Sequence, residues 1–541
     1  MRHYIIGGNM AKRLGALIDC SRNCVYTVDA LKKFIDILAD IGYDYLQLYT
    51  EDTFDIGDPR FGYLRGRYNV AEIKELDGYA SARGIELIPF IQTLGHLKGV
   101  TRWWAYSDIC DTGNILLAGE EKTYALIDKM FAACAEMYTS RNINIGMDEA
   151  DMVGLGKYLS KHGYRNRYDV LLEHLRNVCD IAKKYGFKPM MWSDMFFRLA
   201  NDGSYKVSDG FVVPKEIMDK VPPEVRLIYW DYYSKDKATY DAQFKAHKQF
   251  RNEILFAGGA WCWNGFAPHN NWSVRINKEA FISCNDNGIN DICITEWKDD
   301  GGESSLFSVL PALFASAQFF RGNYDMMDIK CKFGKKFGID YDDFTALDLP
   351  DMLDGDGMEN PSKYMLYSDP FLGYMDSTVD EGKARFFAEA KTKIDKSVSN
   401  KEYGYIFQTI SALCDVLDIK YDLGVRTRGA YRNKNIDELR AIVSDYRELD
   451  GRIKTLYDAV KTQRNKECKP HGFENQDLRF GGLIMRVKHC VERIEEYLCG
   501  EVYGIPELEE DILPCMPEVP QGKSVNHNHW LATALIKFAE D

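Results

Sequence analysis

Long apolar runs are absent from this sequence, and so is the pattern of a secretory leader. No stretch reaches the roughly 18 consecutive apolar residues that a membrane-spanning helix needs. The N-terminal sequence MRHYIIGGNMAKRLGALIDC lacks the apolar run and small-residue cleavage site of a signal peptide. We therefore expect a cytoplasmic protein with no membrane partner.

Cysteine is sparse, and its spacing indicates neither a disulfide scaffold nor a metal site. The 541 residues include 14 cysteines, too few for a disulfide-rich fold, and no Cys-x-x-Cys pair occurs. No His-x-His motif follows the first predicted strand, which disfavours a metal-dependent amidohydrolase barrel. We expect reduced structural thiols, no metal and no other cofactor.

Positive charge is also in deficit. Lys and Arg number 68 against 82 Asp and Glu, for a net charge of −14, and this balance disfavours nucleic acid as a partner. Aromatic residues, by contrast, make up 13% of the chain. Aromatic faces pack on the C–H groups of sugars, although core packing explains the same enrichment.

The first 300 residues alternate short apolar runs with amphipathic helical stretches. Near-continuous apolar runs of this length are typical of buried parallel strands. Eight such units predict an α/β fold of the TIM (β/α)8 type; an open doubly wound sheet is the alternative, but no Gly-rich phosphate loop follows the first run. The predicted strands are 15–22, 43–50, 85–93, 142–150, 188–195, 226–233, 254–261 and 291–298.

The composition changes twice after the predicted barrel. A stretch rich in Asp, Gly, Pro and Met follows, and beyond it almost every segment has helical periodicity. We therefore predict a catalytic barrel over 1–340, a connecting segment over 341–380 and an all-α domain over 381–541. Apolar stripes on the last domain suit a homodimer.

Polar and aromatic residues gather at the C-terminal ends of the predicted strands, where TIM barrels place their active sites. The most informative is the pair Asp148 and Glu149, which closes the fourth strand. Two close carboxylates shift each other's pKa, so that one can stay protonated as a general acid. An isolated Asp-Glu pair is common, however, and on its own is better explained as a helix cap or an ion pair.

The surrounding motifs decide between these interpretations, because the chain resembles glycoside hydrolase family 20, the β-N-acetylhexosaminidases. Gly146-Met147-Asp148-Glu149-Ala150 is similar to the hallmark motif of that family. Further similarities follow in chain order over about residues 15–300. They are LIDCSR with Arg22, PFIQTLGHL with His96, MMWSDMF with Trp192, LIYWDYY with Trp230, and TEWKDD with Trp297 and Asp299.

The resemblance implies an exo-acting, retaining, substrate-assisted mechanism, an exception to the two-carboxylate scheme. Glu149 is then the general acid and base, while Asp148 orients the substrate's 2-acetamido group, whose carbonyl attacks the anomeric carbon. Arg22, His96 and Asp299 bind the sugar polar groups, and Trp192, Trp230 and Trp297 wall the pocket. The implied substrate is a small oligosaccharide or glycoside with terminal β-linked N-acetylglucosamine or N-acetylgalactosamine.

Three positions depart from the family pattern. Gln92 and Asn144 stand where family members often have an acid and a histidine, which predicts a different hydrogen-bond network behind the general acid. The seventh strand, GGAWCWNGF, offers Trp261 and Trp263 in place of the tyrosine that binds the acetamide oxygen. Tyr232 or Tyr233 on the sixth strand is the candidate replacement.

Two other functions stay open at this point. A retaining exo-glycosidase with a carboxylate nucleophile would need a second carboxylate about 5 Å from the acid and no 2-acetamido group. A sugar-binding protein without turnover would keep the pocket alone. The intact Asp148-Glu149 pair favours an enzyme over the latter.

Overall fold

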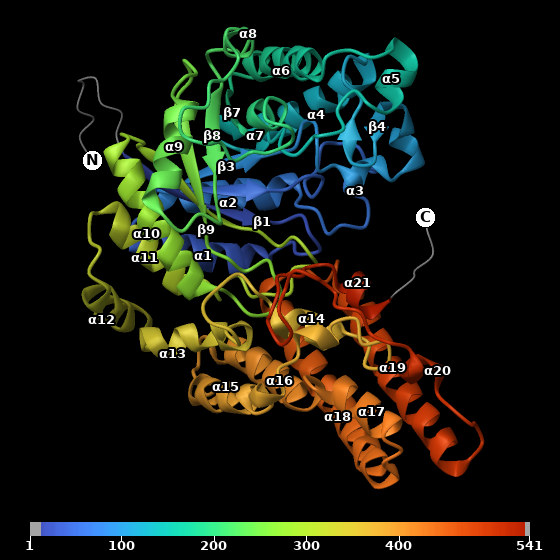
Figure 1. Cartoon of the computed structure of the whole chain (residues 1–541). Helices are drawn as coiled ribbons and strands as arrows, with labels where there is room; N and C mark the ends of the chain where they lie inside the picture. The colour runs from blue at the N-terminus through green and yellow to red at the C-terminus, as the bar shows by residue number, and fades with distance from the viewer. Residues whose placement is uncertain (1–11, 536–541) are drawn as a thin grey trace.

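The computed structural model describes residues 12–535, and its first part is a closed barrel of eight parallel strands (Figure 1). The strand order is β1-β10-β9-β8-β7-β6-β3-β2, and pairing of β1 with both β2 and β10 closes the ring. All eight strands predicted from the sequence are present, which confirms the TIM barrel. They are β1 (Arg13–Asp19), β2 (Tyr45–Tyr49), β3 (Glu86–Phe90), β6 (Asn142–Asn144), β7 (Lys188–Trp192), β8 (Arg226–Trp230), β9 (Ile254–Gly259) and β10 (Asp291–Glu296).

Helices connect consecutive strands and cover the outside of the barrel (Figure 1). Helix α1 shows why they form: the Thr27 side chain accepts from the backbone N–H of Ala30, an N-cap, and Gly42 ends the helix at φ 91°. The barrel helices are α1 (Val28–Ile41), α2 (Val70–Ala82), α4 (Glu121–Met137), α6 (Arg167–Lys184), α7 (Asp194–Arg198), α8 (Lys215–Met218), α9 (Lys237–His247), α10 (Asn270–Asp286) and α11 (Leu310–Phe320).

The loops after β3 and β6 contain small elements of their own. They are α3 (Lys98–Thr101), the antiparallel pair β4 (Cys110–Thr112) and β5 (Ile115–Leu116), and α5 (Lys157–His162). Loops that leave the carboxyl ends of barrel strands are where this fold builds its sites. The site is therefore expected among them.

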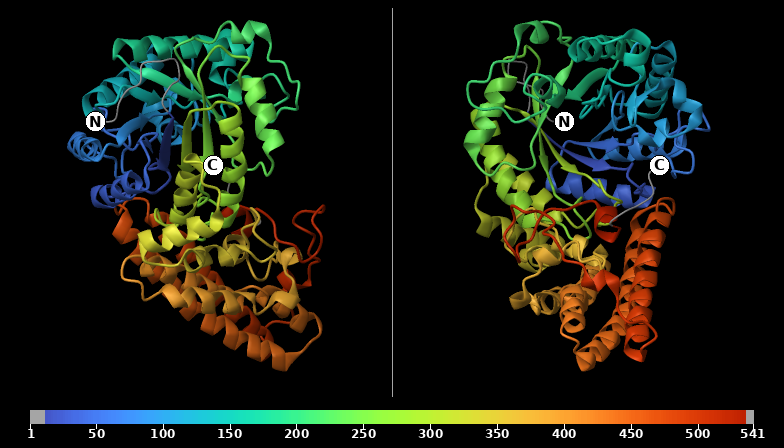
Figure 2. Two further views of the ribbon diagram at one scale, coloured as in Figure 1. Left: turned by 90° about the vertical axis from the view of Figure 1, so that its left-hand side faces the viewer. Right: turned by 45° about the vertical axis from the view of Figure 1, so that its right-hand side comes forward.

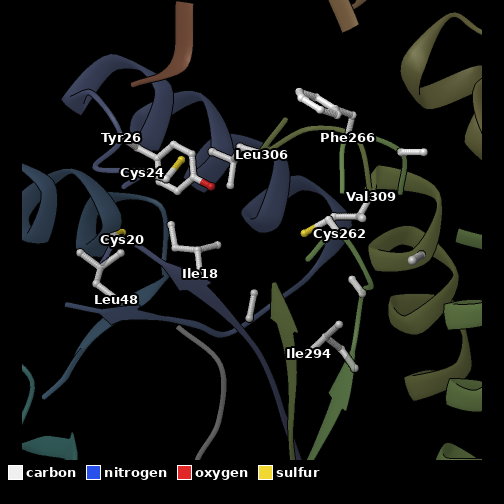
Figure 3. Packing of buried hydrophobic residues seen from close by; sticks show 14 of the residues in the cluster. Ile18, Cys20, Cys24, Tyr26, Leu48, Cys262, Phe266, Ile294, Leu306 and Val309 are labelled. Atoms are coloured by element: carbon white, nitrogen blue, oxygen red, sulfur yellow. The ribbon is translucent and has the colours of Figure 1, made fainter. Parts of the chain in front are cut away.

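Period-two alternation along the strands divides the core of the barrel into two clusters. Leu17 and Ile88 point inward, with the interior cluster, whereas Ile18 and Leu48 point outward against helices and loops. Figure 3 shows part of this outer cluster, where Ile18 lies below Tyr26 and Leu306, and Leu48 lies beside Cys20. The interior cluster ends in aromatic side chains toward the carboxyl ends of the strands, which form the floor of a pocket.

After the barrel the described chain is helical, which confirms the all-α region. Figure 2 shows these helices packed together at one side of the barrel rather than around it. They are α12 (Met326–Phe337), α13 (Tyr341–Thr345), α14 (Pro361–Tyr367), α15 (Phe386–Ile394), α16 (Gly404–Lys420), α17 (Leu423–Arg432), α18 (Ile436–Glu467), α19 (Glu474–Cys499), α20 (Pro506–Glu509) and α21 (Trp530–Ala534). Among residues 12–535, no helix is both long and apolar enough to cross a bilayer.

The stretch expected as a connecting segment, 341–380, contains α13 and α14, and every residue of α14 is buried. The bounds of the three-part division stay a prediction. The helical region touches the barrel at the carboxyl ends of β1 and β10: the N–H of Thr27 donates to the carbonyl of Glu467 at 2.9 Å, and the Glu467 carboxylate accepts from Ser305.

Candidate active site

One pocket lies at the carboxyl ends of the barrel strands, and eleven of the twelve predicted site residues line it. The exception is Trp261, which is 1% exposed and stacks behind Trp263 with ring centroids 4.5 Å apart. Trp261 therefore supports the wall and does not face the pocket. The lining residues are Arg22, His96, Asp148, Glu149, Trp192, Trp230, Tyr232, Tyr233, Trp263, Trp297 and Asp299.

An unusual backbone turn brings both carboxylates of the Asp148-Glu149 pair to the same pocket. Adjacent residues of a regular strand point to opposite faces, but β6 ends at Asn144, and Gly146, Met147 and Glu149 follow with φ of 69°, 69° and 49°. Positive φ is costly for residues other than glycine, and such strain is typical of functional sites. Gly146 is required for space, since a Cβ there would lie 2.0 Å from Gln92 Oε1.

Asp148 is held in its ionised form. Burial raises the pKa of this carboxyl, but the charge of His96 and the hydrogen bond from Gln92 outweigh burial and lower it. His96 Nε2 lies 3.1 Å from Oδ2, and Gln92 Nε2 donates to Oδ1 at 2.9 Å. Although burial lowers the pKa of His96, Asp148 raises it to about 9, so the imidazole is positive at neutral pH.

Glu149 shows the opposite behaviour. Burial and the neighbouring charge of Asp148 raise the pKa of this carboxyl, against the opposing charges of His96 and Arg198. Its side chain is nevertheless 44% exposed, and Arg198 Nη2 donates to Oε1 at 3.1 Å. A carboxyl with a raised pKa that reaches into a pocket is suited to donate a proton.

Asp194 also belongs to the surroundings of the pair, although it was not among the site residues predicted from the sequence. It is fully buried behind the pair, where Oδ2 accepts from the backbone N–H of Glu149 and from Arg198 Nε, both at 3.0 Å. Burial and the charge of Asp148 raise its pKa to about 7. Its place two residues after Trp192, at the end of the fifth barrel strand, was the available signal.

Gln92 and Asn144, the two departures from the family pattern, form a neutral network under the pair. Gln92 Nε2 also donates to Tyr49 Oη at 3.3 Å, and its Oε1 accepts from the N–H of Met147 at 3.2 Å. Asn144 donates to Gln47 and accepts from the N–H of Gly146 at 3.0 Å. Amide side chains thus fix the backbone turn that carries Asp148.

Arg22 is the centre of an acidic cluster at the opposite wall. Its Nη1 donates to Asp19 Oδ2 at 2.8 Å and to Asp299 Oδ1 at 3.1 Å, and Nη2 lies 3.8 Å from Glu51 Oε1. The guanidinium also lies over the rings of Tyr49 and Trp297. Asp299 is 46% exposed, and burial raises its pKa to about 6 despite Arg22. These donors and acceptors suit the hydroxyl groups of a sugar.

Aromatic rings form the remaining walls. Trp230 and Tyr232 stack with centroids 5.3 Å apart, and Trp263 meets Tyr232 edge-on at 5.4 Å. Trp297 Nε1 donates to the hydroxyl oxygen of Tyr232 at 3.1 Å. Tyr233 is 39% exposed at the rim. A pocket with apolar faces and a few convergent polar groups fits a sugar ring.

Among residues 12–535, no three His, Cys, Asp or Glu side chains are grouped as a metal ion would need. Paired carboxylates with oppositely shifted pKa values, set among aromatic rings at the carboxyl ends of a (β/α)8 barrel, define the class of the glycoside hydrolases.

Comparison with models of known protein families narrows this class to one family. Residues 13–238 match the model described as "Glycosyl hydrolase family 20, catalytic domain", and residues 342–527 match "Glycoside Hydrolase 20C C-terminal domain". The chain belongs to glycoside hydrolase family 20. The resemblance inferred from its sequence motifs is confirmed.

Similar proteins carry related names. Hexosaminidase D of Homo sapiens is 24% identical over 339 residues, which cover 58% of this chain and 66% of that protein. Beta-hexosaminidase of Vibrio furnissii is 24% identical over 227 residues, covering 34% of this chain and 37% of that protein. The chain thus spans about two thirds of the length of the human relative and just over one third of the bacterial one.

Solved structures of low identity include the β-N-acetylhexosaminidase from Bacteroides fragilis, with a TM-score of 0.47, 20% identity and coverage of 61% of this chain and 70% of that one. The GH20 exo β-N-acetylglucosaminidase from Vibrio harveyi has a TM-score of 0.47 and 15% identity, covering 64% of this chain and 60% of that one.

Proposed function

We propose that this protein is an exo-acting, retaining β-N-acetylhexosaminidase that uses the substrate's own acetamido group as nucleophile. The observation that carries the proposal is the opposite pKa shift of Asp148 and Glu149 within one pocket. Family membership and the names of the relatives support the substrate class. Cytoplasmic location and a homodimer stay predictions from the sequence.

In the first step the protonated carboxyl of Glu149 gives its proton to the glycosidic oxygen. The carbonyl oxygen of the 2-acetamido group attacks the anomeric carbon, the bond to the leaving group breaks, and an oxazolinium ring forms. Asp148, kept ionised by His96 and Gln92, accepts a hydrogen bond from the acetamide N–H and stabilises the positive charge of the ring.

In the second step Glu149, now ionised, takes a proton from water, and the water oxygen attacks the anomeric carbon. The bond between this carbon and the oxazolinium oxygen breaks, which restores the 2-acetamido group. The two inversions give net retention. Asp194 and Arg198 act through Glu149: one fixes its backbone N–H, and the other donates to its carboxylate. They are positioning residues in this scheme.

The remaining residues of the pocket contact the other parts of the sugar in this scheme. The rings of Trp192, Trp297 and Tyr232 surround the space for the acetamide methyl group, while Arg22 and Asp299 bind hydroxyls at the non-reducing end. Tyr232 and Tyr233 are the candidates for a hydrogen bond to the acetamide oxygen, because no tyrosine stands on β9.

Matched chromogenic β-glucosides test the mechanism, one with a 2-acetamido group and one with a 2-hydroxyl group. We expect cleavage of the acetamido substrate alone. Equal cleavage of both substrates would instead require a carboxylate nucleophile, and no cleavage of either would favour a sugar-binding protein.

Glu149→Gln should lower kcat by about 10²–10⁴-fold with an unchanged circular dichroism spectrum, and near-normal kcat would exclude Glu149 as the acid.

A further inference from the structure

A second groove opens beside the catalytic pocket, past Arg22. It shares Arg22, His96 and Asp299 with the pocket, so the two spaces are continuous. Its volume is about 480 Å³, against about 90 Å³ for the pocket. A terminal sugar bound in the pocket would therefore have additional space beyond the hydroxyls that face Arg22.

The walls of this groove come from four loops and one distant helix. The loops follow β1, β2, β3 and β10, and Arg479 of α19 closes the far side. Five of the lining side chains are Arg or Lys and three are Asp or Glu. This excess of positive charge is local, since the whole chain has a net charge of −14.

Most of these charges already have partners. Arg22 pairs with Asp19 and Asp299, and Arg479 pairs with the Asp300 and Glu303 carboxylates at 2.9 and 2.8 Å. These pairs leave little net charge to attract a ligand.

Arg65 is also paired, through Nε, with Asp52 Oδ1 at 3.5 Å. Asp52 lies under the floor of the groove, where a Cβ on Gly99 would come 2.6 Å from its Oδ2. This carboxylate is only 1% exposed, and burial raises its pKa against the charges of Arg65 and Arg102.

Lys98 and Arg102 are different. Within residues 12–535 neither side chain makes an ion pair or a hydrogen bond, and both are exposed. They stand four residues apart on α3 and the turn that follows it, a spacing that places them on one side. The Arg102 guanidinium lies 4.7 Å from the ring of Trp103, which restricts its motion.

We propose that the groove binds an anionic substituent of the terminal sugar, a sulfate, phosphate or carboxylate group, through Lys98 and Arg102. Charge-assisted hydrogen bonds from Arg and Lys are the strong contacts for such oxygens. A cleft lined by one sign of charge also raises the local concentration of an oppositely charged substrate. This inference rests on the proposed function, because it assigns the substrate class of the same site.

Chromogenic 2-acetamido-β-glucosides test this, unsubstituted or carrying one sulfate ester at O3, O4 or O6. We expect the full-length protein to cleave one sulfated isomer with a kcat/KM at least equal to that of the unsubstituted substrate. Lys98→Ala/Arg102→Ala should lower this ratio about tenfold, mainly through KM, and leave the unsubstituted substrate unaffected. Added salt should reduce the preference of the wild type.

Control substitutions separate local from global effects of charge. Lys183→Ala/Lys215→Ala removes two exposed lysines on α6 and α8, which also lack ion pairs among the described residues and do not line the groove. This variant should keep the wild-type ratio. A neutral O-methyl ether at the preferred hydroxyl separates charge from size, and phosphate and carboxymethyl analogues identify the preferred anion.

The inference is wrong if no sulfated isomer reaches the rate of the unsubstituted substrate, or if the Lys98/Arg102 variant keeps the wild-type ratio. The proposed function is judged separately, by the need for the acetamido group in the unsubstituted pair. If no substrate is turned over, calorimetry measures the affinity for free N-acetylglucosamine and for its sulfates. Tighter binding of one sulfate, lost in the Lys98/Arg102 double variant, would support anion binding by the groove. Equal affinity for the sulfated and unsulfated sugars would overturn it.

Discussion

Replacing His96 by Gln removes the positive charge that lies 3.1 Å from Asp148 and 3.7 Å from Glu149. Two unit charges 3.1 Å apart attract with about 1 kcal/mol in water and about 5 kcal/mol at an effective dielectric constant of 20. Since about 1.4 kcal/mol corresponds to a factor of ten in a protonation equilibrium, even the lower value is measurable. The 18% exposure of His96 places the expected effect in the lower half of this range.

The assay is the pH dependence of kcat/KM on the acetamido substrate, whose limbs report the free enzyme's acid and base. Protonation of Asp148 removes the group that stabilises the oxazolinium ring, so the acidic limb should move to higher pH by about one pH unit or more in His96→Gln. His162→Gln, at an exposed histidine 3.6 Å from Glu120, should leave the limb in place. An unmoved acidic limb in His96→Gln would refute the assignment of Asp148 and His96 as a charged pair.

The same pair makes a prediction for stability. The raised pKa of His96 adds stability that is complete below the ordinary value of 6.5 and is lost as pH rises through about 9. The lowered pKa of Asp148 adds stability above its ordinary 3.8, lost as pH falls further. The difference in denaturation midpoint between wild type and His96→Gln should therefore be largest between about pH 4 and 6.5 and vanish above pH 9. A constant difference across this range would contradict the pairing.

Three further substitutions test the surroundings of the pair. Asp194→Asn weakens the hydrogen bonds that fix the Glu149 N–H and Arg198 Nε, so kcat should fall while KM changes little; an unchanged kcat would show that Asp194 does not position Glu149. Arg479→Met leaves Lys363 to pair with both Asp300 and Glu303, and the loss of one buried cation should destabilise the fold by up to about 3–5 kcal/mol while raising KM, as judged by urea unfolding and kinetics; an unfolding curve like that of the wild type would exclude its role. Of Tyr232→Phe and Tyr233→Phe, one should lower kcat for the acetamido substrate about tenfold if it binds the acetamide oxygen, and wild-type kcat in both would exclude both.

The eight strands could be predicted because each is a short, buried, apolar run, and buried parallel strands impose that pattern on the sequence. The convergence of Arg22, Asp148, Trp192 and Asp299 followed from it, since each stands at or just after the end of a strand, and the carboxyl ends of parallel strands meet at one end of the barrel. Here local sequence position is enough to place a side chain in space.

Trp261 shows where this reasoning fails. It stands at the end of its strand as the lining residues do, yet it is buried behind Trp263. In a regular strand, Trp261 and Trp263 would point to one face and the residue between them to the other. However, β9 ends at Gly259, and the chain beyond it is irregular. Once the strand has ended, the pattern no longer determines which side chain faces the pocket.

Arg479 shows a second limit, because its role depends on contacts that the sequence does not indicate. On α19 it belongs to an ordinary amphipathic helix, yet it is 3% exposed and holds Asp300 and Glu303, residues almost 180 positions earlier. Those residues shape the loop that carries Asp299.

Arg464, at the end of α18, likewise donates to the backbone carbonyl of Asn23, next to Arg22. The helical region thus holds both loops from which the barrel presents Arg22 and Asp299 to the pocket. Arg479 shares the buried carboxylates of Asp300 and Glu303 with Lys363, and Arg464 satisfies a backbone carbonyl of the loop after β1. This wall of the pocket therefore depends on the helical region, although every residue that lines the pocket belongs to the barrel.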